Sequence, residues 1–274
     1  MKILRTLEEA TGCAGCVLVP TMGALHQGHG VLIRRAAEIA RGRLVVASVF
    51  VNPTQFNDPS DLAKYPRTLD TDAVLAERAG AGVVFAPSDV SVYPAEREVR
   101  VPVLPEVATA PGLEDAWRPG HFAGVCQVVA RFFEMLRPSA ALFGEKDWQQ
   151  LQVVRAMASR DFPGLEIVPV ETVRERDGLA MSSRNARLGG VERARASAVS
   201  RALCEACAEE SVSGAEGRMR GVLDDAGLEV EYCVVRDGLS LMPLGASARE
   251  GRALIAARCG GVRLIDNAPW RARG

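Results

Sequence analysis

Apolar, strand-like runs alternate with helical patterns over residues 17–170, and this alternation constrains the fold more than any other feature of the chain. The run at 44–51 is continuously apolar and rich in β-branched residues, which is typical of a strand buried on both faces. Strands that alternate with helices lie parallel in one sheet. We therefore predict an α/β fold, a Rossmann-like doubly wound parallel sheet. Strands are expected at 17–19, 44–51, 83–85, 140–143 and 166–170.

The longest amphipathic pattern opens at residues 118–122 and ends at Arg137. Its apolar side chains recur at helical spacing, so we predict a helix with one face in the core. That face consists of Val125, Val128, Val129, Phe132, Phe133 and Leu136. Other helices are expected at about 30–40 and 69–79 and, after the strand at 140–143, up to about residue 159, whereas 87–120 reads as irregular connection.

The composition changes after about residue 172, where we predict a domain boundary. Residues 1–172 would form a Rossmann-like domain and residues 173–274 a smaller α+β domain. Residues 192–226 are rich in alanine, arginine and glutamate and predict helices broken at Ser213-Gly214. The strands of this domain are expected at 230–235, 253–256 and 262–265.

The composition also excludes some classes of protein. The 274 residues are 48% hydrophobic and 24% charged, with a formal net charge of −1 and a pI near 6.4, which argues against a nucleic-acid-binding surface as the main function. No apolar run approaches the ~18 residues that a membrane span needs, and residues 1–6 lack a signal-peptide core. Seven cysteines, an odd number, point to reduced thiols. We expect a cytoplasmic protein without nucleic-acid or membrane partners.

Two C-x-x-C pairs occur, Cys13/Cys16 and Cys204/Cys207. A zinc site would have to combine pairs from opposite ends of the chain, and the second pair lies within a helical pattern. A redox pair of the thioredoxin type follows a strand and opens a helix, whereas Cys13 and Cys16 precede a strand. We therefore interpret these cysteines as packed or surface thiols rather than metal ligands or a redox site.

The segment from Pro20 to His29, PTMGALHQGH, follows the strand at 17–19 and precedes a helix. A strand, a glycine-bearing loop and a helix N-terminus form a common phosphate site, because the helix start offers backbone N–H groups and a partial positive charge. His26 and His29 would add two donors there. Elsewhere in a chain, such a pair would be one structural and one surface histidine, but its position here favours phosphate binding. The pattern resembles the signature of the H-x-G-H nucleotidylyl-transfer superfamily.

Polar residues also follow other strands. Asn52 and Gln55 come after the strand at 44–51, where open α/β sheets bind ligands, although an Asx-turn with an exposed glutamine is the alternative. Lys146 follows the strand at 140–143 and could reach a phosphate, or could be an ordinary solvated lysine. The serines and arginine of the loop 182–184 suit phosphate oxygens, with an exposed polar loop as the alternative.

Six motifs in order resemble those of the pantothenate synthetase family, also called pantoate–β-alanine ligases, and the likeness runs over about residues 1–268. The sequence departs from the family's usual pattern at Thr54, Trp148 and Gly30. The end of the chain also fits, at residues 263–267, RLIDN. The six motifs are PTMGALHQGH at 20–29, FVNPTQF at 50–56, YPRT at 65–68, RPGHFAGV at 118–125, FGEKDWQQ at 143–150 and DGLAMSSRN at 177–185.

The resemblance implies an enzyme that condenses (R)-pantoate with β-alanine, using ATP and Mg²⁺, through a pantoyl-adenylate intermediate, with release of AMP and pyrophosphate. It also makes residues 1–172 the catalytic domain that binds ATP and pantoate and residues 173–274 a lid domain, and it suggests a homodimer formed through the N-terminal domain. The metal ligands are unknown. By position, the catalytic groups would be His29, His26, Lys146 and Arg184, with His29 as the active-site acid. Gln55 would bind pantoate and β-alanine, and Gln150 would bind pantoate.

The resemblance also implies which residues bind ATP. They lie in four segments. Residues 22–29 would line the phosphates, residues 144–147 would reach the phosphates and the ribose, Val173 would touch the adenine, and residues 181–184 would cover the phosphates. These residues are Met22, Gly23, Ala24, Leu25, His26, Gln27, Gly28, His29, Gly144, Glu145, Lys146, Asp147, Val173, Met181, Ser182, Ser183 and Arg184.

Three alternatives remain. Another H-x-G-H adenylyltransferase of cofactor biosynthesis would release pyrophosphate but no AMP. A fragment of an aminoacyl-tRNA synthetase would need a basic surface for RNA, and the C-terminal part of this chain is roughly neutral. A catalytically inactive ATP-binding module would be expected to lack one of the histidines or the lysine, and this chain retains all of them.

Overall fold

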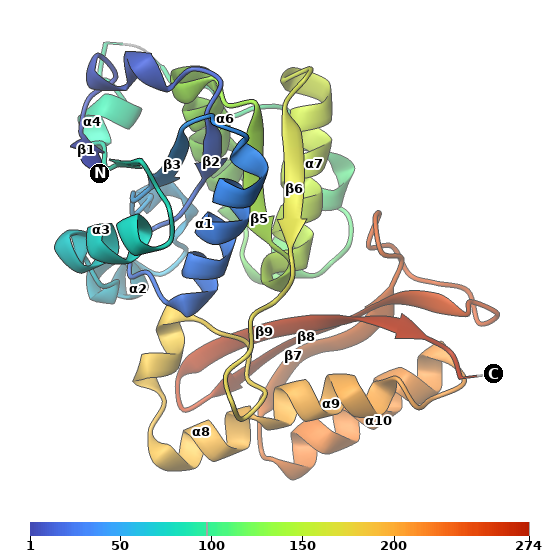
Figure 1. Cartoon of the computed structure of the whole chain (residues 1–274). Helices are drawn as coiled ribbons and strands as arrows, with labels where there is room; N and C mark the ends of the chain where they lie inside the picture. The colour runs from blue at the N-terminus through green and yellow to red at the C-terminus, as the bar shows by residue number, and fades with distance from the viewer. Residues whose placement is uncertain (97, 274) are drawn as a thin grey trace. The chain divides into compact units, whose positions relative to one another are not determined.

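The computed structural model describes residues 1–96 and 98–273, which divide into two compact units (Figure 1). The N-terminal unit comprises Met1–Thr109, Arg118–Glu145 and Gln150–Glu171. The C-terminal unit comprises Ala110–Trp117, Lys146–Gln149 and Thr172–Gly274. Two short segments from the first two thirds of the chain thus pack with the C-terminal unit. None of the helices in the described residues is long and apolar enough to cross a membrane.

The N-terminal unit contains a six-stranded sheet in the order β1-β4-β3-β2-β5-β6, and every neighbouring pair is parallel. This topology confirms the predicted doubly wound fold. The strand predicted at 44–51 is shorter than expected, because the chain leaves the sheet after Ser48 to form the following loop. The strands are β1 (Lys2–Leu4), β2 (Val17–Val19), β3 (Val45–Ser48), β4 (Val83–Phe85), β5 (Ala140–Gly144) and β6 (Glu166–Val170).

Helices cover both faces of this sheet. On one face, α1 (Gln27–Ala40) and α3 (Leu69–Arg78) pack their apolar side chains against β2, β3 and β4. On the other face lies α6 (His121–Leu136), whose Phe132 ring lies 6.0 Å from that of Phe85 in β4. The core face predicted for α6 is confirmed, since all six of its apolar side chains are buried. The remaining long helix, α7 (Trp148–Asp161), follows β5.

Two helix predictions need correction. Helix α1 begins at Gln27, three residues before the expected start, because the His26 side chain caps it. The segment 87–120 contains short helices rather than only irregular chain. The short elements of the first two thirds of the chain are η1 (Glu9–Cys13), η2 (Pro53–Gln55), α2 (Pro59–Lys64), α4 (Asp89–Val92), η3 (Glu106–Ala108), α5 (Glu114–Trp117) and η4 (Glu145–Asp147).

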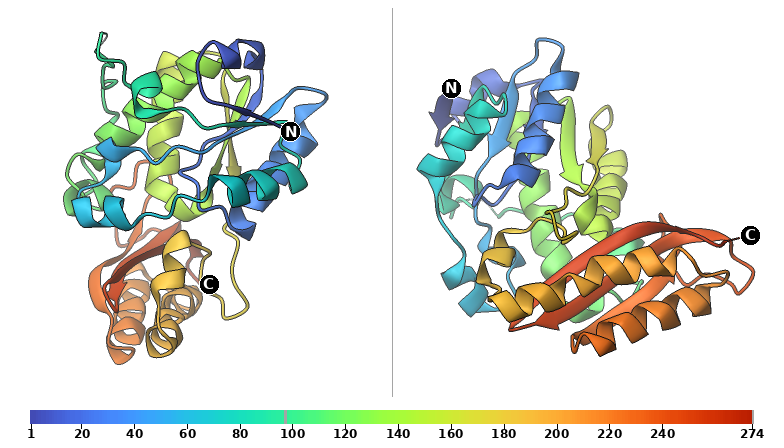
Figure 2. Two further views of the ribbon diagram at one scale, coloured as in Figure 1. Left: turned by 90° about the vertical axis from the view of Figure 1, so that its left-hand side faces the viewer. Right: turned by 60° about the horizontal axis from the view of Figure 1, so that its bottom comes forward.

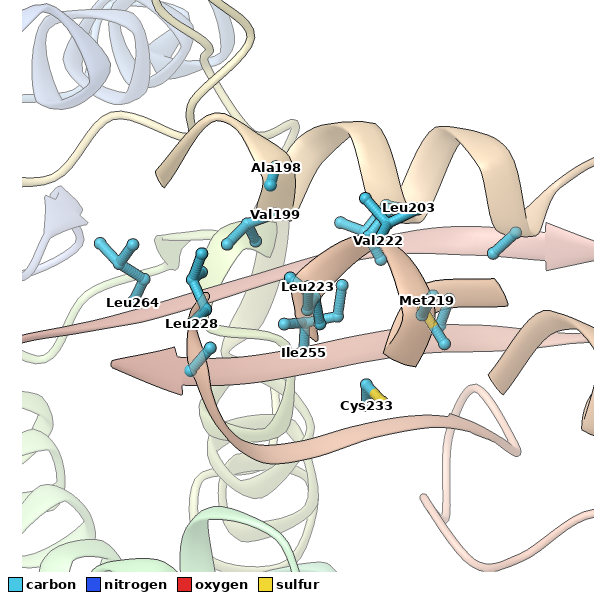
Figure 3. Packing of buried hydrophobic residues seen from close by; sticks show 14 of the residues in the cluster. Ala198, Val199, Leu203, Met219, Val222, Leu223, Leu228, Cys233, Ile255 and Leu264 are labelled. Carbon is cyan, nitrogen blue, oxygen red and sulfur yellow. The ribbon is translucent and has the colours of Figure 1, made fainter. Parts of the chain in front are cut away.

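The C-terminal unit is an antiparallel sheet covered on one face by two helices (Figure 2). Its strands are β7 (Glu229–Arg236), β8 (Glu250–Cys259) and β9 (Val262–Arg271), so β8 and β9 are longer than predicted. Helices α9 (Ala198–Ala206) and α10 (Val212–Asp225) follow η5 (Ser183–Arg187) and α8 (Gly190–Ala196). Figure 3 shows Leu223 of α10 beside Ile255 of the sheet, in a buried cluster that also contains Val199 and Leu203 of α9.

The break predicted at Ser213-Gly214 is misplaced. Both residues lie in the first turn of α10, and the Ser211 hydroxyl accepts a hydrogen bond from the Gly214 N–H at 3.1 Å. Serine and glycine next to each other indicate a helix boundary, but this pair lies in the first turn of the second helix, just after the break between α9 and α10 at residues 207–211.

Candidate active site

Three neighbouring strands of the N-terminal unit end beside one another and carry several predicted ligand-binding segments (Figure 1). β2 pairs with β3 on one side and with β5 on the other. Because the strands are parallel, their carboxyl ends lie at the same edge of the sheet. The chain continues from β3 to β4 on one side and from β5 to β6 on the other, and ligands of open α/β sheets bind where the strand order diverges in this way.

The loop after β2 ends in the two histidines of the H-x-G-H pattern. The Gly28 N–H donates to Nδ1 of His26 at 3.1 Å, and the His26 N–H donates to Nδ1 of His29 at 3.2 Å. These are the two reciprocal bonds of a capping box, here made by imidazoles. The ring centroids lie 4.1 Å apart. The two side chains therefore both start the helix and lie together at its N-terminus.

This capping box determines the tautomers of both imidazoles. A ring nitrogen that accepts a hydrogen bond from a backbone N–H carries no proton. In both His26 and His29 that nitrogen is Nδ1, so the ring proton lies on Nε2. Each ring therefore presents an Nε2–H donor, which is the form that can donate to an oxygen of a phosphoryl group.

The same bonds revise one expectation from the sequence. The backbone N–H groups of this loop were expected to bind phosphate, but several of them donate to groups of the protein itself. The Gly23 N–H donates to the Thr21 hydroxyl, those of Ala24 and Leu25 donate to Asp72, and those of His26 and Gly28 donate to the imidazoles. These five N–H groups are therefore already used within the protein.

Asp72 holds the loop and is the residue that the sequence did not single out. It lies in the first turn of α3 and is 1% exposed. Its carboxylate accepts from the Ala24 and Leu25 N–H groups at 3.0 and 2.7 Å, and from the Thr68 hydroxyl at 3.2 Å. The loop needs such support, because Gly23 and Ala24 both have left-handed φ angles, 84° and 50°. The sequence signal that could have drawn attention to Asp72 was its position four residues after Thr68 of the YPRT motif.

The loop after β3 brings Gln55 next to the histidine loop. The Gln55 amide contacts the Met22 sulfur at 2.9 Å and accepts from Asn52 at 3.2 Å. Asn52 is 1% exposed, and its Oδ1 accepts from the Tyr93 hydroxyl at 2.7 Å. The backbone of this loop also lies so close to Gly124 in α6 that a Cβ there would be 2.4 Å from the Thr54 carbonyl oxygen. Gln55 and Met22, predicted to bind different substrates, are thus direct neighbours.

The segment after β5 contains the predicted lysine. Gly144 ends the strand, Glu145 and Lys146 form a 3-10 turn, and Gln150 lies half-buried in the first turns of α7. Lys146 keeps its Nζ 3.9 Å from a carboxylate oxygen of Asp147, and its side chain is 20% exposed. Both residues belong to the C-terminal unit, as do the remaining predicted ATP-binding residues.

Those remaining residues lie in a hairpin-like segment of the C-terminal unit. The Met181 N–H donates to the Val173 carbonyl at 2.9 Å, which brings these two residues side by side. Ser182 caps the short helix η5, since its hydroxyl accepts from the Arg184 N–H at 3.3 Å. Ser183 and Arg184 are half-buried in the first turn of η5.

Charged groups hold this segment in place. Arg193 donates to Glu175 at 2.6 Å and to Asp177 at 2.7 Å. These hydrogen bonds hold the pKa of the Glu175 and Asp177 carboxyls below their usual values of 4.5 and 3.8. Arg174 pairs with Asp266 of β9 at 2.6 Å. The segment that carries Ser183 and Arg184 is therefore anchored by ion pairs.

The cysteines show no feature of a reactive or metal site. Burial raises the pKa of Cys16 and of Cys126 to about 12, which disfavours the thiolate needed for nucleophilic or metal chemistry. Cys204 and Cys207 are exposed near the end of α9. Over residues 1–96 and 98–273, no group of three or more His, Cys, Asp or Glu side chains is arranged to hold a metal ion.

The parallel sheet and its histidine-capped helix define a Rossmann-like α/β protein with a candidate ligand site at the carboxyl edge of the sheet. The profile of the pantoate-beta-alanine ligase family matches residues 2–269. The chain therefore belongs to this family, whose members are also called pantothenate synthetases.

Individual relatives agree with this assignment. The pantothenate synthetase of Phocaeicola vulgatus is 44% identical to this chain over an alignment of 287 residues, gaps included. The alignment covers 99% of this chain and 100% of that protein. The crystal structure of pantothenate synthetase from Thermus thermophilus matches with a TM-score of 0.90 and 40% identity, covering 98% and 99% of the two chains. The crystal structure of pantoate-beta-alanine ligase from Francisella tularensis, complexed with beta-gamma ATP and beta-alanine, matches with a TM-score of 0.79 and 29% identity. The match covers 98% of this chain and 97% of that chain.

Proposed function

We propose that this protein condenses (R)-pantoate with β-alanine to form pantothenate, through a pantoyl-adenylate, with release of AMP and pyrophosphate. The observation that carries the proposal is the arrangement at the sheet edge. Two imidazoles with Nε2–H donors follow β2, and Gln55 from the neighbouring strand touches the same loop. Membership of the family and the ATP- and beta-alanine-bound relative support the proposal.

The first step is attack of the pantoate carboxylate on the α-phosphorus of ATP. An acyl–oxygen–phosphorus bond forms, the bond from the α-phosphorus to the bridging oxygen breaks, and pyrophosphate leaves. Negative charge grows on the α-phosphoryl oxygens and on pyrophosphate. In our proposal the Nε2–H groups of His26 and His29 donate to the α-phosphoryl oxygens, while Lys146 and Arg184 neutralise the phosphates.

We propose that the other predicted residues also bind ATP, each at the part of the nucleotide that its segment would meet. Met22, Gly23, Ala24, Leu25, Gln27 and Gly28 shape the loop beside the phosphates. Gly144, Glu145 and Asp147 lie next to Lys146, with Asp147 towards the ribose. Val173 would contact the adenine, and Met181, Ser182 and Ser183 would cover the phosphates.

In the second step, the neutral amine of β-alanine attacks the acyl carbon of the adenylate. The amide bond forms, the nitrogen loses a proton and AMP leaves. This step requires orientation above all, because holding the two reactants together replaces a bimolecular encounter. We propose that Gln55 and Gln150 hold pantoate and that Gln55 also borders the β-alanine position. Asn52 and Met22 keep Gln55 in place for that purpose.

We propose that Mg²⁺ enters with the triphosphate. Magnesium sites of this kind use one or two carboxylates and substrate phosphates rather than a complete protein cage. When bound, the ion would neutralise phosphate charge during the first step.

Product analysis tests the proposal. The purified protein should release AMP from ATP only when pantoate and β-alanine are both present, and it should form pantothenate in equal amount. Pyrophosphate release without AMP would instead indicate an adenylyltransferase of the same superfamily and would overturn the ligase proposal.

Two further properties are proposed on the family resemblance, namely a homodimer formed through the N-terminal unit and a cytoplasmic location. Light scattering on the purified protein tests the first, because a mass equal to that of one 29.3 kDa chain would contradict it. Fractionation of the source cells tests the second.

A further inference from the structure

One face of the antiparallel sheet in the C-terminal unit carries buried polar side chains that the proposed mechanism does not use. Ala253, Ile255 and Leu264 face the helices α9 and α10. Side chains alternate along a strand, so Arg252 in β8 and Asn267 in β9 lie on the opposite face. They are only 6% and 3% exposed, and buried polar groups of this kind need partners.

The Asn267 carboxamide joins Arg252 to the main chain of Lys146. The Arg252 Nε–H donates to Oδ1 of Asn267 at 2.7 Å, and Nδ2 of Asn267 donates to the Lys146 carbonyl oxygen at 2.8 Å. Arginine can only donate and a carbonyl can only accept, so the amide has a single orientation that satisfies both partners. All three residues belong to the same unit.

Arg252 also holds the residue two positions after the lysine. Its guanidinium carbon lies 3.6 Å from the centroid of the Trp148 ring, which is a cation–π contact. The Trp148 indole N–H donates to the Gly238 carbonyl at 2.8 Å. The Lys146 main chain and the Trp148 side chain, on either side of Asp147, are therefore held by the C-terminal sheet and the loop that precedes β8.

We propose that Asn267 is a positioning residue that acts through Lys146. The lysine ammonium lies at the end of a flexible side chain of four methylene groups. Its average position therefore depends on how strongly the Lys146 main chain is restrained. The hydrogen bond from Asn267 restrains the peptide group of Lys146 itself. This inference rests on the proposed function, because it assumes that Lys146 stabilises the phosphates during adenylate formation.

Asn267→Asp is the sharpest test of this role. Aspartate has nearly the same shape and can still accept from Arg252, but it has no amide to donate to the Lys146 carbonyl. We expect kcat for pantoate-dependent pyrophosphate release to fall about tenfold, which is the size expected for losing one buried hydrogen bond and leaving its acceptor unsatisfied. The KM values for pantoate and β-alanine should stay the same, because neither substrate contacts Asn267 in the proposal.

A double-mutant cycle with Lys146→Ala separates positioning from general destabilisation. If Asn267 acts through the lysine side chain, Asn267→Asp should lower kcat in the parent but have no further effect in the Lys146→Ala protein. Equal losses in both backgrounds, or an unchanged kcat in the parent, would overturn the proposal.

Tyr232→Phe is the matched control. The Tyr232 hydroxyl donates to Glu114 at 2.7 Å, and this bond lies on the same face of the sheet without involving Lys146. The control should lower the melting temperature about as much as Asn267→Asp while leaving kcat unchanged. A loss of kcat equal to that of Asn267→Asp would show that any damage to this face slows the enzyme, and would overturn the positioning role.

Arg252→Lys covers the case in which Asn267→Asp does not fold. Lysine at position 252 keeps the charge but lacks the Nε–H that donates to Asn267, so the Asn267 amide is no longer held in one orientation. We expect a smaller loss of kcat than in Asn267→Asp, and again no further loss when the substitution is combined with Lys146→Ala. Failure of the unmodified protein to form pantothenate would overturn the proposed function and this inference together. Activity of the unmodified protein with additive losses in the cycle would overturn only the inference.

Discussion

The segments that follow the neighbouring strands β2 and β5 are held in different ways. The histidine loop after β2 is held mainly from nearby, by two bonds between residues at most three positions apart and by Asp72, 47 and 48 positions away. The lysine segment after β5 is held by Asn267, 121 positions away. The first segment is thus built largely into its own helix start, whereas the second depends on a sheet formed near the end of the chain.

This difference predicts which substitutions separate activity from stability. In our proposal, the same imidazole of the histidine loop caps the helix through Nδ1 and offers Nε2–H to the substrate, so a suitable substitution can remove one function and keep the other. In the lysine segment the functional group and its support belong to different residues. The predictions below test this contrast, from the largest expected effect to the smallest.

His29→Asn should have the largest effect on activity. The asparagine amide oxygen can take the place of Nδ1 as the acceptor of the His26 N–H, but the side chain is too short to replace the Nε2–H donor. We expect adenylate formation to fall by about 10²- to 10³-fold, while the melting temperature changes little. Single-turnover measurement of pyrophosphate release and thermal unfolding check the two halves. Near-normal pyrophosphate release would reject the catalytic role of His29.

Lys146→Ala gives the matching experiment in the other segment. We expect a loss of at least about 10²-fold in the same assay with the fold intact, because in our proposal the ammonium neutralises phosphate charge. If the variant keeps most of its activity, Lys146 has no role in phosphate binding, which is the alternative given in the sequence analysis.

Asp72→Asn tests the support of the histidine loop. The carboxylate accepts from two loop N–H groups, whereas an amide offers only one acceptor atom and turns its NH₂ towards a donor. We expect about 1–3 kcal/mol lower unfolding free energy and roughly tenfold lower kcat. Asp70→Asn, an exposed carboxylate in the same helix, is the control and should change neither quantity. An unchanged kcat in Asp72→Asn would show that the loop keeps its shape without this support.

Trp148→Phe should have a smaller effect on the lysine segment. Phenylalanine keeps a ring for Arg252 but loses the indole N–H bond to Gly238. We expect the unfolding free energy to fall by about 0.5–1.5 kcal/mol, measured by urea denaturation, with kcat nearly unchanged. A loss of kcat as large as that of Asn267→Asp would mean that Trp148, and not Asn267, sets the position of the segment.

Arg193→Gln should have the smallest effect and one that depends on pH. Arg193 lowers the pKa of Glu175 and of Asp177, so its contribution is fully present above their usual values of 4.5 and 3.8 and disappears as the pH falls through the lowered values. We expect a loss of no more than about 1 kcal/mol at neutral pH, because the groups are partly exposed. Urea denaturation should show that the difference from the parent decreases as the pH falls below the usual values of 4.5 and 3.8. Arg176→Gln, an exposed arginine of the same segment, is the control, and a difference that persists at acid pH would contradict the ion-pair explanation.

Much of the fold could be predicted because its signals are local. β2, β4 and β6 lie where short apolar runs indicated, and the core face of α6 has the predicted residues. The errors fell at element ends and in the segment 87–120, where short helices were missed. α1 starts early because a histidine, an uncommon cap, begins it, and β3 ends early because the chain turns into the loop that holds Gln55.

The candidate site shows the same limit. The histidine motif and the segment around Lys146 are contiguous in sequence and could be recognised, although their roles stay predictions. Asp72 could not be assigned to the loop, because the hydrogen bonds that reveal its part come from a different helix. Asn267 lies in a stretch that resembles the family, but its partner could not be inferred from that stretch.

The sequence by itself determined the class of fold, the family and the place of the two histidines at a helix start, because each depends on residue patterns within a few turns or strands. Only the tertiary structure decided the tautomers of the imidazoles, the use of the loop N–H groups and the support of Lys146 by Asn267. The physical reason is that a hydrogen bond requires a donor and an acceptor at about 3 Å. For the tautomers this depends on the geometry of a local helix start, and for the Asp72 and Asn267 bonds it depends on how groups tens of residues apart pack.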